Sequence, residues 1–149
     1  MILYYAFGGG FGHLSRTSAL IHTLKLPIND VLILTNSKYA HLVFAQEQIL
    51  MISETFYHKP DELFQLVKNA ISDYGISEMY IDAFPSGILG ELNELKTNYC
   101  KIFYIARILN WKNYSPLIGI KNLHFEKTFI IEPLPDIQLE FIKNNSSSD

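Results

Sequence analysis

The sequence predicts an α/β protein, a Rossmann-like three-layer sandwich with a mainly parallel sheet of about six or seven strands. Short apolar runs, suited to strands buried on both faces, alternate along the chain with segments of helical periodicity. The first apolar run, residues 2–7, leads directly into a glycine-rich loop at 8–12. A glycine loop between the first strand and the first helix is typical of Rossmann-like domains.

The predicted strands are short, continuous apolar runs. They are residues 2–7, 30–35, 49–53, 78–82, 101–106 and 127–132. The predicted helices have apolar residues spaced by three or four positions. They are residues 14–25, 37–48, 60–74 and 87–96. Pro116 and Gly119 interrupt residues 109–123, so no helix is assigned there.

Two of these helices have recognisable ends. Pro60, Asp61 and Glu62 suit a first turn, because proline needs no N–H partner there and acids favour the positive end of the helix dipole. Gly75 is expected to end the same helix in a left-handed conformation. Ser86 is expected to cap the helix at 87–96.

The length and composition favour one globular domain. The chain has 149 residues, of which we assign 1–143 to the domain and the polar end, 144–149, to a disordered tail. No apolar run approaches the ~20 residues of a membrane helix, and the first residues are interpreted as a strand rather than a signal peptide. The single cysteine, Cys100, excludes an internal disulfide and favours the cytoplasm, free or at the membrane periphery.

The charge pattern argues against two classes of function. The net charge is −3 and the basic residues are scattered, whereas nucleic-acid binding needs a dense face of Lys and Arg. The five histidines show no metal-binding spacing, and no second cysteine joins them. No metal site is therefore expected.

The glycine loop belongs to the segment GGGFGHLSR, residues 8–16. Glycine lets the backbone approach a ligand closely, and the unpaired N–H groups of a helix start suit phosphate. We therefore expect Gly9, Gly10, Phe11 and Gly12 to contact the ligand. The segment is not a dinucleotide fingerprint, because His13 occupies the third glycine position, and it lacks the Gly-Lys-Ser/Thr of a P-loop.

His13 lies at the predicted start of the first helix, at the ligand end of the sheet. A neutral imidazole there can accept a proton, so one interpretation is a general base. The other is a histidine that only hydrogen-bonds a neighbouring loop. Arg16, one turn later, also has two interpretations: it pairs with a phosphate or carboxylate, or it is simply solvated.

A second motif, DAFPSG at 82–87, follows the fourth predicted strand. Asp82 could hold His13 in the correct tautomer, as the third member of a catalytic triad does, provided that the first and fourth strands are neighbours. The alternative is an aspartate that caps its own loop. Ser86 and Gly87 begin a predicted helix and form a second candidate anion site.

A third motif, ARILNW at 106–111, follows the fifth predicted strand. Arg107 is expected to face the same ligand edge and to bind substrate. Trp111 could stack on a sugar ring, although packing in the core is the favoured interpretation. Aromatic and polar residues after the third strand could line an acceptor pocket. They are Phe56, Tyr57 and His58.

Three stretches together resemble the amino-terminal lobe of GT-B glycosyltransferases. They are GGGFGHLSRTSAL at 8–20, DAFPSGILGEL at 82–92 and ARIL at 106–109. They occur in the family's order and are spread over most of the chain. The family includes the cell-wall lipid-linked N-acetylglucosaminyltransferase and plant nucleotide-sugar glycosyltransferases, and the likeness is closest to a group of predicted bacterial glycosyltransferases.

The resemblance implies one lobe of a GT-B fold that moves a sugar from a nucleotide-sugar donor to a hydroxyl acceptor. It implies transfer with inversion and without an essential metal or cofactor. It also implies roles for two residues: His13 deprotonates the acceptor hydroxyl, and Asp82 orients the imidazole.

Members of this family use a second Rossmann-like lobe to bind the donor, and this sequence ends at Asp149, near the expected interlobe linker. The expected partner is a donor-binding subunit or a second copy of the chain, and the expected acceptor is a small molecule or a lipid-linked molecule. Two rival hypotheses stay open. One is a non-catalytic binding module or degenerate glycosyltransferase fragment, and the other is an unrelated Rossmann-like nucleotide binder.

Overall fold

The computed structural model describes residues 1–8, 11–119 and 124–147. Its centre is a six-stranded sheet in the order β3-β2-β1-β4-β5-β6, in which every neighbouring pair is parallel. The strands are β1 Ile2–Ala6, β2 Val31–Thr35, β3 Ile49–Met51, β4 Glu78–Ala83, β5 Lys101–Ala106 and β6 Lys127–Ile130. The α-helices are α1 Phe11–Thr23, α2 Pro60–Asp73, α3 Trp111–Tyr114 and α4 Asp136–Asn145.

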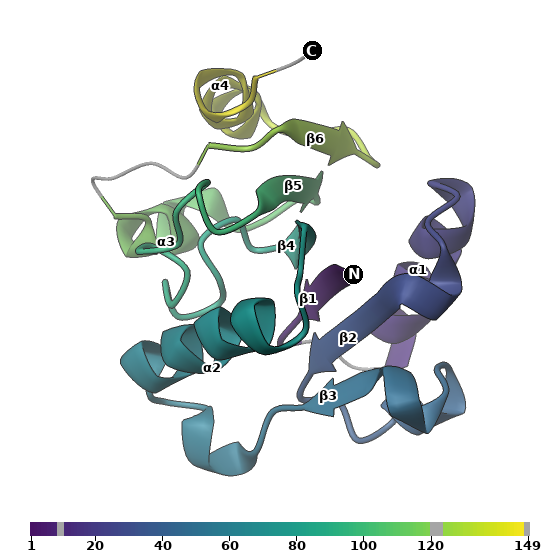
Figure 1. Cartoon of the computed structure of the whole chain (residues 1–149). Helices are drawn as coiled ribbons and strands as arrows, with labels where there is room; N and C mark the ends of the chain where they lie inside the picture. The colour runs from purple at the N-terminus through teal and green to yellow at the C-terminus, as the bar shows by residue number, and fades with distance from the viewer. Residues whose placement is uncertain (9–10, 120–123, 148–149) are drawn as a thin grey trace.

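Helices lie on both faces of the sheet, which confirms the predicted Rossmann-like three-layer fold. α1 lies on one face, and α2, α3 and α4 lie on the other (Figure 1). Alternate residues of β1 face the two sides: Leu3 and Tyr5 pack in the core with α2, whereas Tyr4 and Ala6 pack in the core with α1. A strand that is buried on both faces carries apolar side chains on both, so its sequence is a continuous apolar run.

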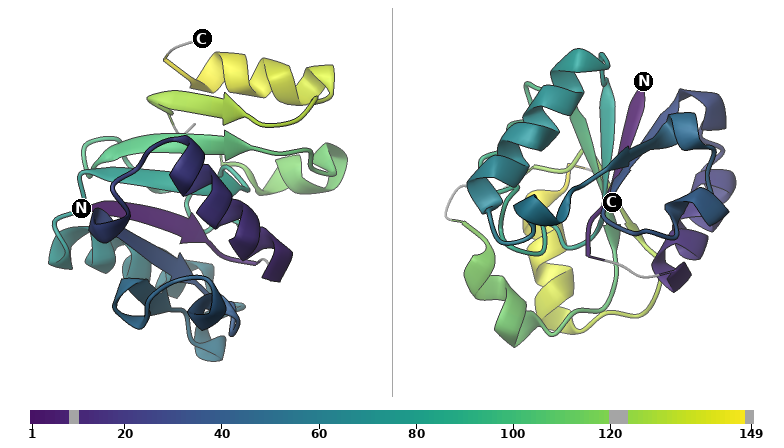
Figure 2. Two further views of the ribbon diagram at one scale, coloured as in Figure 1. Left: turned by 90° about the vertical axis from the view of Figure 1, so that its right-hand side faces the viewer. Right: turned by 90° about the horizontal axis from the view of Figure 1, so that it is seen from below.

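The face that carries α1 is covered unevenly. No described helix lies over β6 on this side (Figure 2, left). Aromatic rings fill part of the space instead, since the rings of Tyr80 and Phe103 stack with centroids 4.8 Å apart and Tyr4 lies 6.2 Å beyond Tyr80. Phe129 on β6 extends this row and stays half-exposed.

Every predicted strand is present, and its ends lie within two residues of the predicted ones. The prediction for α2 is also confirmed: the helix begins at Pro60, buries Leu63, Val67 and Ala70, and is followed by Gly75 with φ +60°. The chain beyond β6 continues into α4, whose last two residues, 144 and 145, fall inside the segment expected to be a disordered tail.

The predicted helix at 37–48 is wrong. Two 3₁₀ helices of three residues each stand there, Ala40–Leu42 and Gln46–Gln48, separated by the extended backbone of Ala45. Ala40 and Phe44 are buried in the core on the α1 face. A helix this short has little stability of its own, so the packing of these two side chains decides the backbone conformation.

The predicted helix at 87–96 is also wrong, because a series of turns follows β4 instead. Gly87 and Gly90 have φ values of +80° and +75°, which a right-handed helix cannot contain. Leu92 and Leu95 are nevertheless buried, as predicted. The spacing of the apolar residues therefore predicted correctly that Leu92 and Leu95 are buried. The backbone conformation differs from a helix because of the two glycines.

Candidate functional site

The carboxyl ends of β1 and β4 lie side by side in the centre of the sheet. These strands pair in parallel from Ile2 with Glu78 to Tyr5 with Ile81, which confirms the predicted neighbourhood of the first and fourth strands. The chain runs outward from β1 to β2 and β3 on one side and from β4 to β5 and β6 on the other. This is the topological switch point, where open parallel sheets bind ligands.

Asp82 is the buried acid at this point. It is 7% exposed, near the end of β4, and the hydroxyl of Tyr4 donates a hydrogen bond to its Oδ1 at 3.4 Å. Burial is the largest cause of a raised pKa of Tyr4, and the charge of Asp82 adds to it. Tyr4 therefore stays neutral and serves Asp82 as a fixed donor.

The residue after Asp82 has an unusual backbone. Ala83 has φ +65°, a left-handed conformation that costs a non-glycine residue about 1–2 kcal/mol. The hydroxyl of Tyr104 donates to the carbonyl oxygen of Ala83 at 2.7 Å and holds it there. Such strain persists only where the surroundings enforce it, and it is often found at functional sites.

Gly8, the first residue of the glycine loop, follows β1 at this same edge of the sheet. Gly8 has φ +98°, and its N–H donates to Oδ1 of Asn36 at 2.9 Å, which ties the loop to the end of β2. A Cβ on Gly8 would come within 2.7 Å of Ile88, so the loop also lies close to the turns after β4.

Several predicted ligand contacts lie outside the described part of this loop. They are Gly9 and Gly10; of Phe11, Gly12 and His13 only the backbone is described. The backbone of His13 belongs to the first turn of α1, as predicted. Thr17, four residues later on the same helix, is buried and hydrogen-bonds Tyr4. Arg16 is exposed on α1.

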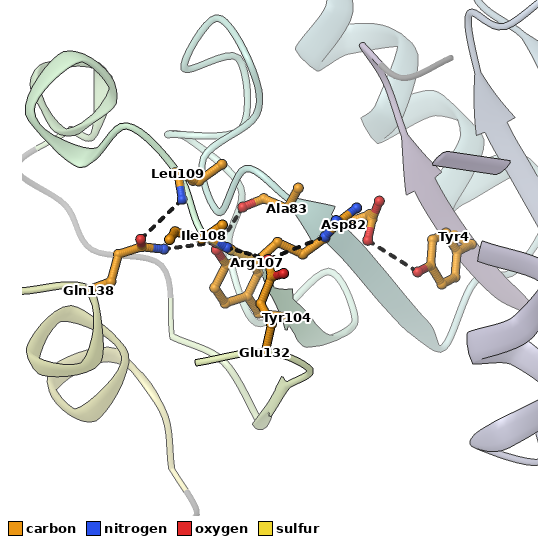
Figure 3. Close-up of polar contacts among 9 residues, drawn as sticks. All are labelled: Tyr4, Asp82, Ala83, Tyr104, Arg107, Ile108, Leu109, Glu132 and Gln138. Carbon is orange, nitrogen blue, oxygen red and sulfur yellow. Dashed lines mark hydrogen bonds and ion pairs between the residues drawn. The ribbon is translucent and has the colours of Figure 1, made fainter. Parts of the chain in front are cut away.

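Arg107 lies at the same edge, directly after β5. Its side chain extends toward Asp82 and Tyr4 (Figure 3), and its charge acts on the Tyr4 hydroxyl. The Nε atom of Arg107 lies 3.7 Å from Oε1 of Glu132. The structure thus brings together Tyr4, Asp82 and Arg107, of which sequence patterns indicated only the last two as site residues.

The second candidate anion site, at Ser86 and Gly87, was expected because a helix was predicted to begin there. No helix begins there, and both residues are buried. The N–H of Ser86 donates to the hydroxyl of Tyr114 at 2.8 Å, and that hydroxyl donates to the carbonyl oxygen of Gly87 at 2.8 Å. A backbone donor already used by a buried tyrosine is not offered to a ligand.

Behind this loop lies a buried carboxyl group that the sequence patterns did not indicate. Glu91 is 3% exposed, accepts the Tyr5 hydroxyl at 2.5 Å and the N–H of Leu89 at 2.8 Å. Burial raises its pKa, and the hydrogen bond from Tyr5 opposes that shift. Glu91 supports the turns after β4 from the face opposite to Asp82.

The aromatic candidates are divided between core and surface. Trp111 is half-buried and packs on Tyr114 and Phe141, with centroids 6.0 Å and 5.0 Å away. Tyr57 packs on Phe7 beside the glycine loop. Phe56 lines a surface pocket of about 360 Å³ together with residues of α2.

No three His, Cys, Asp or Glu side chains within 1–8, 11–119 and 124–147 gather as a metal site would require. None of the helices in these ranges is both long and apolar enough to cross a membrane.

Comparisons with protein-family models, with curated proteins and with solved structures find no match for this chain. The fold and the geometry of the strand edge therefore define the class of protein by themselves. It is a Rossmann-like α/β domain with buried polar side chains at the switch point of its sheet.

Proposed function

We propose that this chain is the acceptor-binding lobe or subunit of a glycosyltransferase that moves a sugar from a nucleotide-sugar donor to a hydroxyl acceptor. One observation carries the proposal. The helix start that contains His13 follows β1, and Asp82 stands near the end of the neighbouring β4, so the two motifs flank the switch point of the sheet.

The chemistry assigned to these residues is proton transfer. His13 is the general base that takes the proton of the acceptor hydroxyl, and Asp82 orients and stabilises the imidazolium that forms. The burial of Asp82 supports this role, because a carboxylate near a low-dielectric core interacts more strongly with a neighbouring charge. Arg107 and the glycine loop then bind the acceptor.

Transfer also needs a donor-binding lobe. The donor and the acceptor must be aligned in a site from which water is excluded, and a single edge of one sheet does not enclose a ligand. We infer that a second lobe, in another chain or elsewhere in a longer protein, closes over the carboxyl ends of β1, β4 and β5.

The rival function is nucleotide binding, and the strand order supports it. The same order, 3-2-1-4-5-6, occurs in dinucleotide-binding domains. Those domains use an acid about 20 residues after the glycine loop to bind the ribose. Here β2 is followed by Asn36, whose side chain already accepts the N–H of Gly8. Submicromolar binding of NAD or ATP by the isolated chain would nevertheless favour the rival.

The decisive experiment tests transfer and the role of His13 together. The tagged chain is purified with its native partners, and the eluate is assayed for transfer from a panel of labelled nucleotide sugars. We expect His13→Ala to lower the rate by roughly 10²–10⁴, the contribution of a general base. Asp82→Asn, which keeps the acceptor for Tyr4 but removes the charge, is expected to lower it as well.

The matched control is His22→Ala, which removes an exposed imidazole at the other end of the same helix. It should leave the rate unchanged. Equal rates for the wild-type and His13→Ala proteins would remove His13 from the mechanism, and an eluate that transfers no sugar from any donor would count against the whole proposal.

A further inference from the structure

The segment 107–109 leaves the sheet after β5, and no described strand lies beside it to pair its backbone groups. Side chains of residues much later in the sequence form hydrogen bonds with these backbone groups instead. The N–H of Ile108 donates to Oε1 of Glu132 at 2.7 Å, and the other two bonds come from Gln138. Backbone groups near a core must find partners, so these two side chains decide the path of the segment.

Gln138 acts on this segment as a neighbouring strand would. Its Oε1 accepts the N–H of Leu109 at 3.1 Å, and its Nε2 donates to the carbonyl oxygen of Arg107 at 2.9 Å (Figure 3). The side chain lies on α4 and is 1% exposed. The oxygen and the nitrogen of this buried amide thus bind backbone groups of Leu109 and Arg107. These two hydrogen bonds fix the backbone of Arg107, from which its side chain extends.

Glu132 acts on the charged end of Arg107. Its Oε1 is already bound to the Ile108 N–H and stays 3.7 Å from Nε of Arg107, beyond hydrogen-bond distance. Nε has no accessible surface and no hydrogen-bond partner among the described residues. Glu132 therefore attracts the guanidinium group by charge and leaves the Nε–H donor of Arg107 unused. Buried donors in proteins nearly always have a hydrogen-bond partner, so an unused one at this edge is notable.

We propose that Gln138 and Glu132 are positioning residues of the candidate site, which hold Arg107 so that its guanidinium faces Asp82 and Tyr4 ready to bind an oxygen of the ligand. This inference rests on the proposed function for the identity of the ligand, but the positioning is a property of the chain alone. It makes α4 part of the ligand site. The apolar residues of α4 that pack in the core, such as Phe141 and Ile142, are separate from Gln138.

Hydrogen exchange measured by NMR on the full chain separates positioning from packing. Gln138→Met keeps the length of the side chain and removes both hydrogen bonds. It is expected to speed exchange at the Leu109 amide and at Nε–H of Arg107 by roughly tenfold, the factor for about 1.4 kcal/mol. The control is Ile142→Val, which weakens the packing of the same helix and keeps both hydrogen bonds of Gln138.

Glu132→Gln separates the charge from the hydrogen bond. It keeps an acceptor for Ile108, so the Ile108 amide should stay protected while exchange at Nε–H of Arg107 becomes faster. Two results would overturn the inference. One is unchanged Nε–H exchange in Gln138→Met, and the other is an equal acceleration at Arg107 in Ile142→Val.

A second measurement uses the transfer assay. Because Gln138 acts through a binding residue, Gln138→Met is expected to raise KM for the acceptor by roughly tenfold with little change in kcat. A fall in kcat with KM unchanged would contradict positioning of a binding group. If the wild-type protein transfers no sugar, the proposed function fails, whereas the exchange rates still decide the roles of Gln138 and Glu132.

Discussion

Raising the pH above about 10 is expected to unfold this protein in one cooperative transition. Burial is the largest cause of a raised pKa at each of five core tyrosines. They are Tyr4, Tyr5, Tyr80, Tyr104 and Tyr114. For Tyr80 the pKa rises to about 12. The folded state therefore keeps hydroxyl protons that the unfolded chain loses.

Because folding raises the pKa values of these tyrosines, the stability of the protein falls as the pH rises. The stability that these tyrosines contribute is fully present below the unfolded pKa of about 10 and is lost as the pH rises toward the folded pKa. Each one adds a slope of about 1.4 kcal/mol per pH unit, so the five together add about 7 kcal/mol per unit. A whole domain is stable by roughly 5–15 kcal/mol, and about one or two pH units above 10 are enough to unfold it.

Circular dichroism and tyrosinate absorbance, followed in one pH titration, test this expectation. The two signals should change together. Tyr80→Phe keeps the stacked ring and removes one titrating hydroxyl, so its transition should shift upward, whereas Tyr74→Phe removes an exposed hydroxyl and should shift nothing. Tyrosinate that accumulates while the circular dichroism stays native would show that the core tyrosines ionise without unfolding.

Gly87→Ala is expected to lower the free energy of unfolding by about 3–5 kcal/mol. The residue has φ +80°, which strains any other residue, and a Cβ there would lie 2.1 Å from Oε1 of Glu91. That oxygen cannot easily move, because it accepts the N–H of Leu89 and its carboxyl group also binds Tyr5. The substitution therefore adds a clash to the backbone strain.

Gly75→Ala is the matched control for the strain alone. Gly75 has φ +60°, and a Cβ there would meet nothing within 4 Å. Its cost should be about 1 kcal/mol in a urea unfolding experiment. Equal costs for the two substitutions would show that the Glu91 carboxyl group moves away freely, and Glu91→Ala should recover part of the loss in the Gly87→Ala protein.

The sequence was sufficient for the sheet and for placing two motifs at one of its edges. A strand buried on both faces is a continuous apolar run, and this local pattern located all six strands. The position of Asp82 after such a run, together with the glycine loop after residues 2–7, was enough to expect both motifs at one edge. The pairing of β1 with β4 agrees.

Only the tertiary structure decided the backbone at 37–48 and 87–96 and the partners of Arg107. The two segments carry apolar residues at helical spacing, but the burial of Phe44 and the left-handed glycines at 87 and 90 select other conformations. Gln138 reaches Arg107 from 31 positions along the chain, and Glu132 reaches Ile108 from 24. A side chain that binds a distant backbone group leaves no periodic pattern, so packing alone brings it to the site.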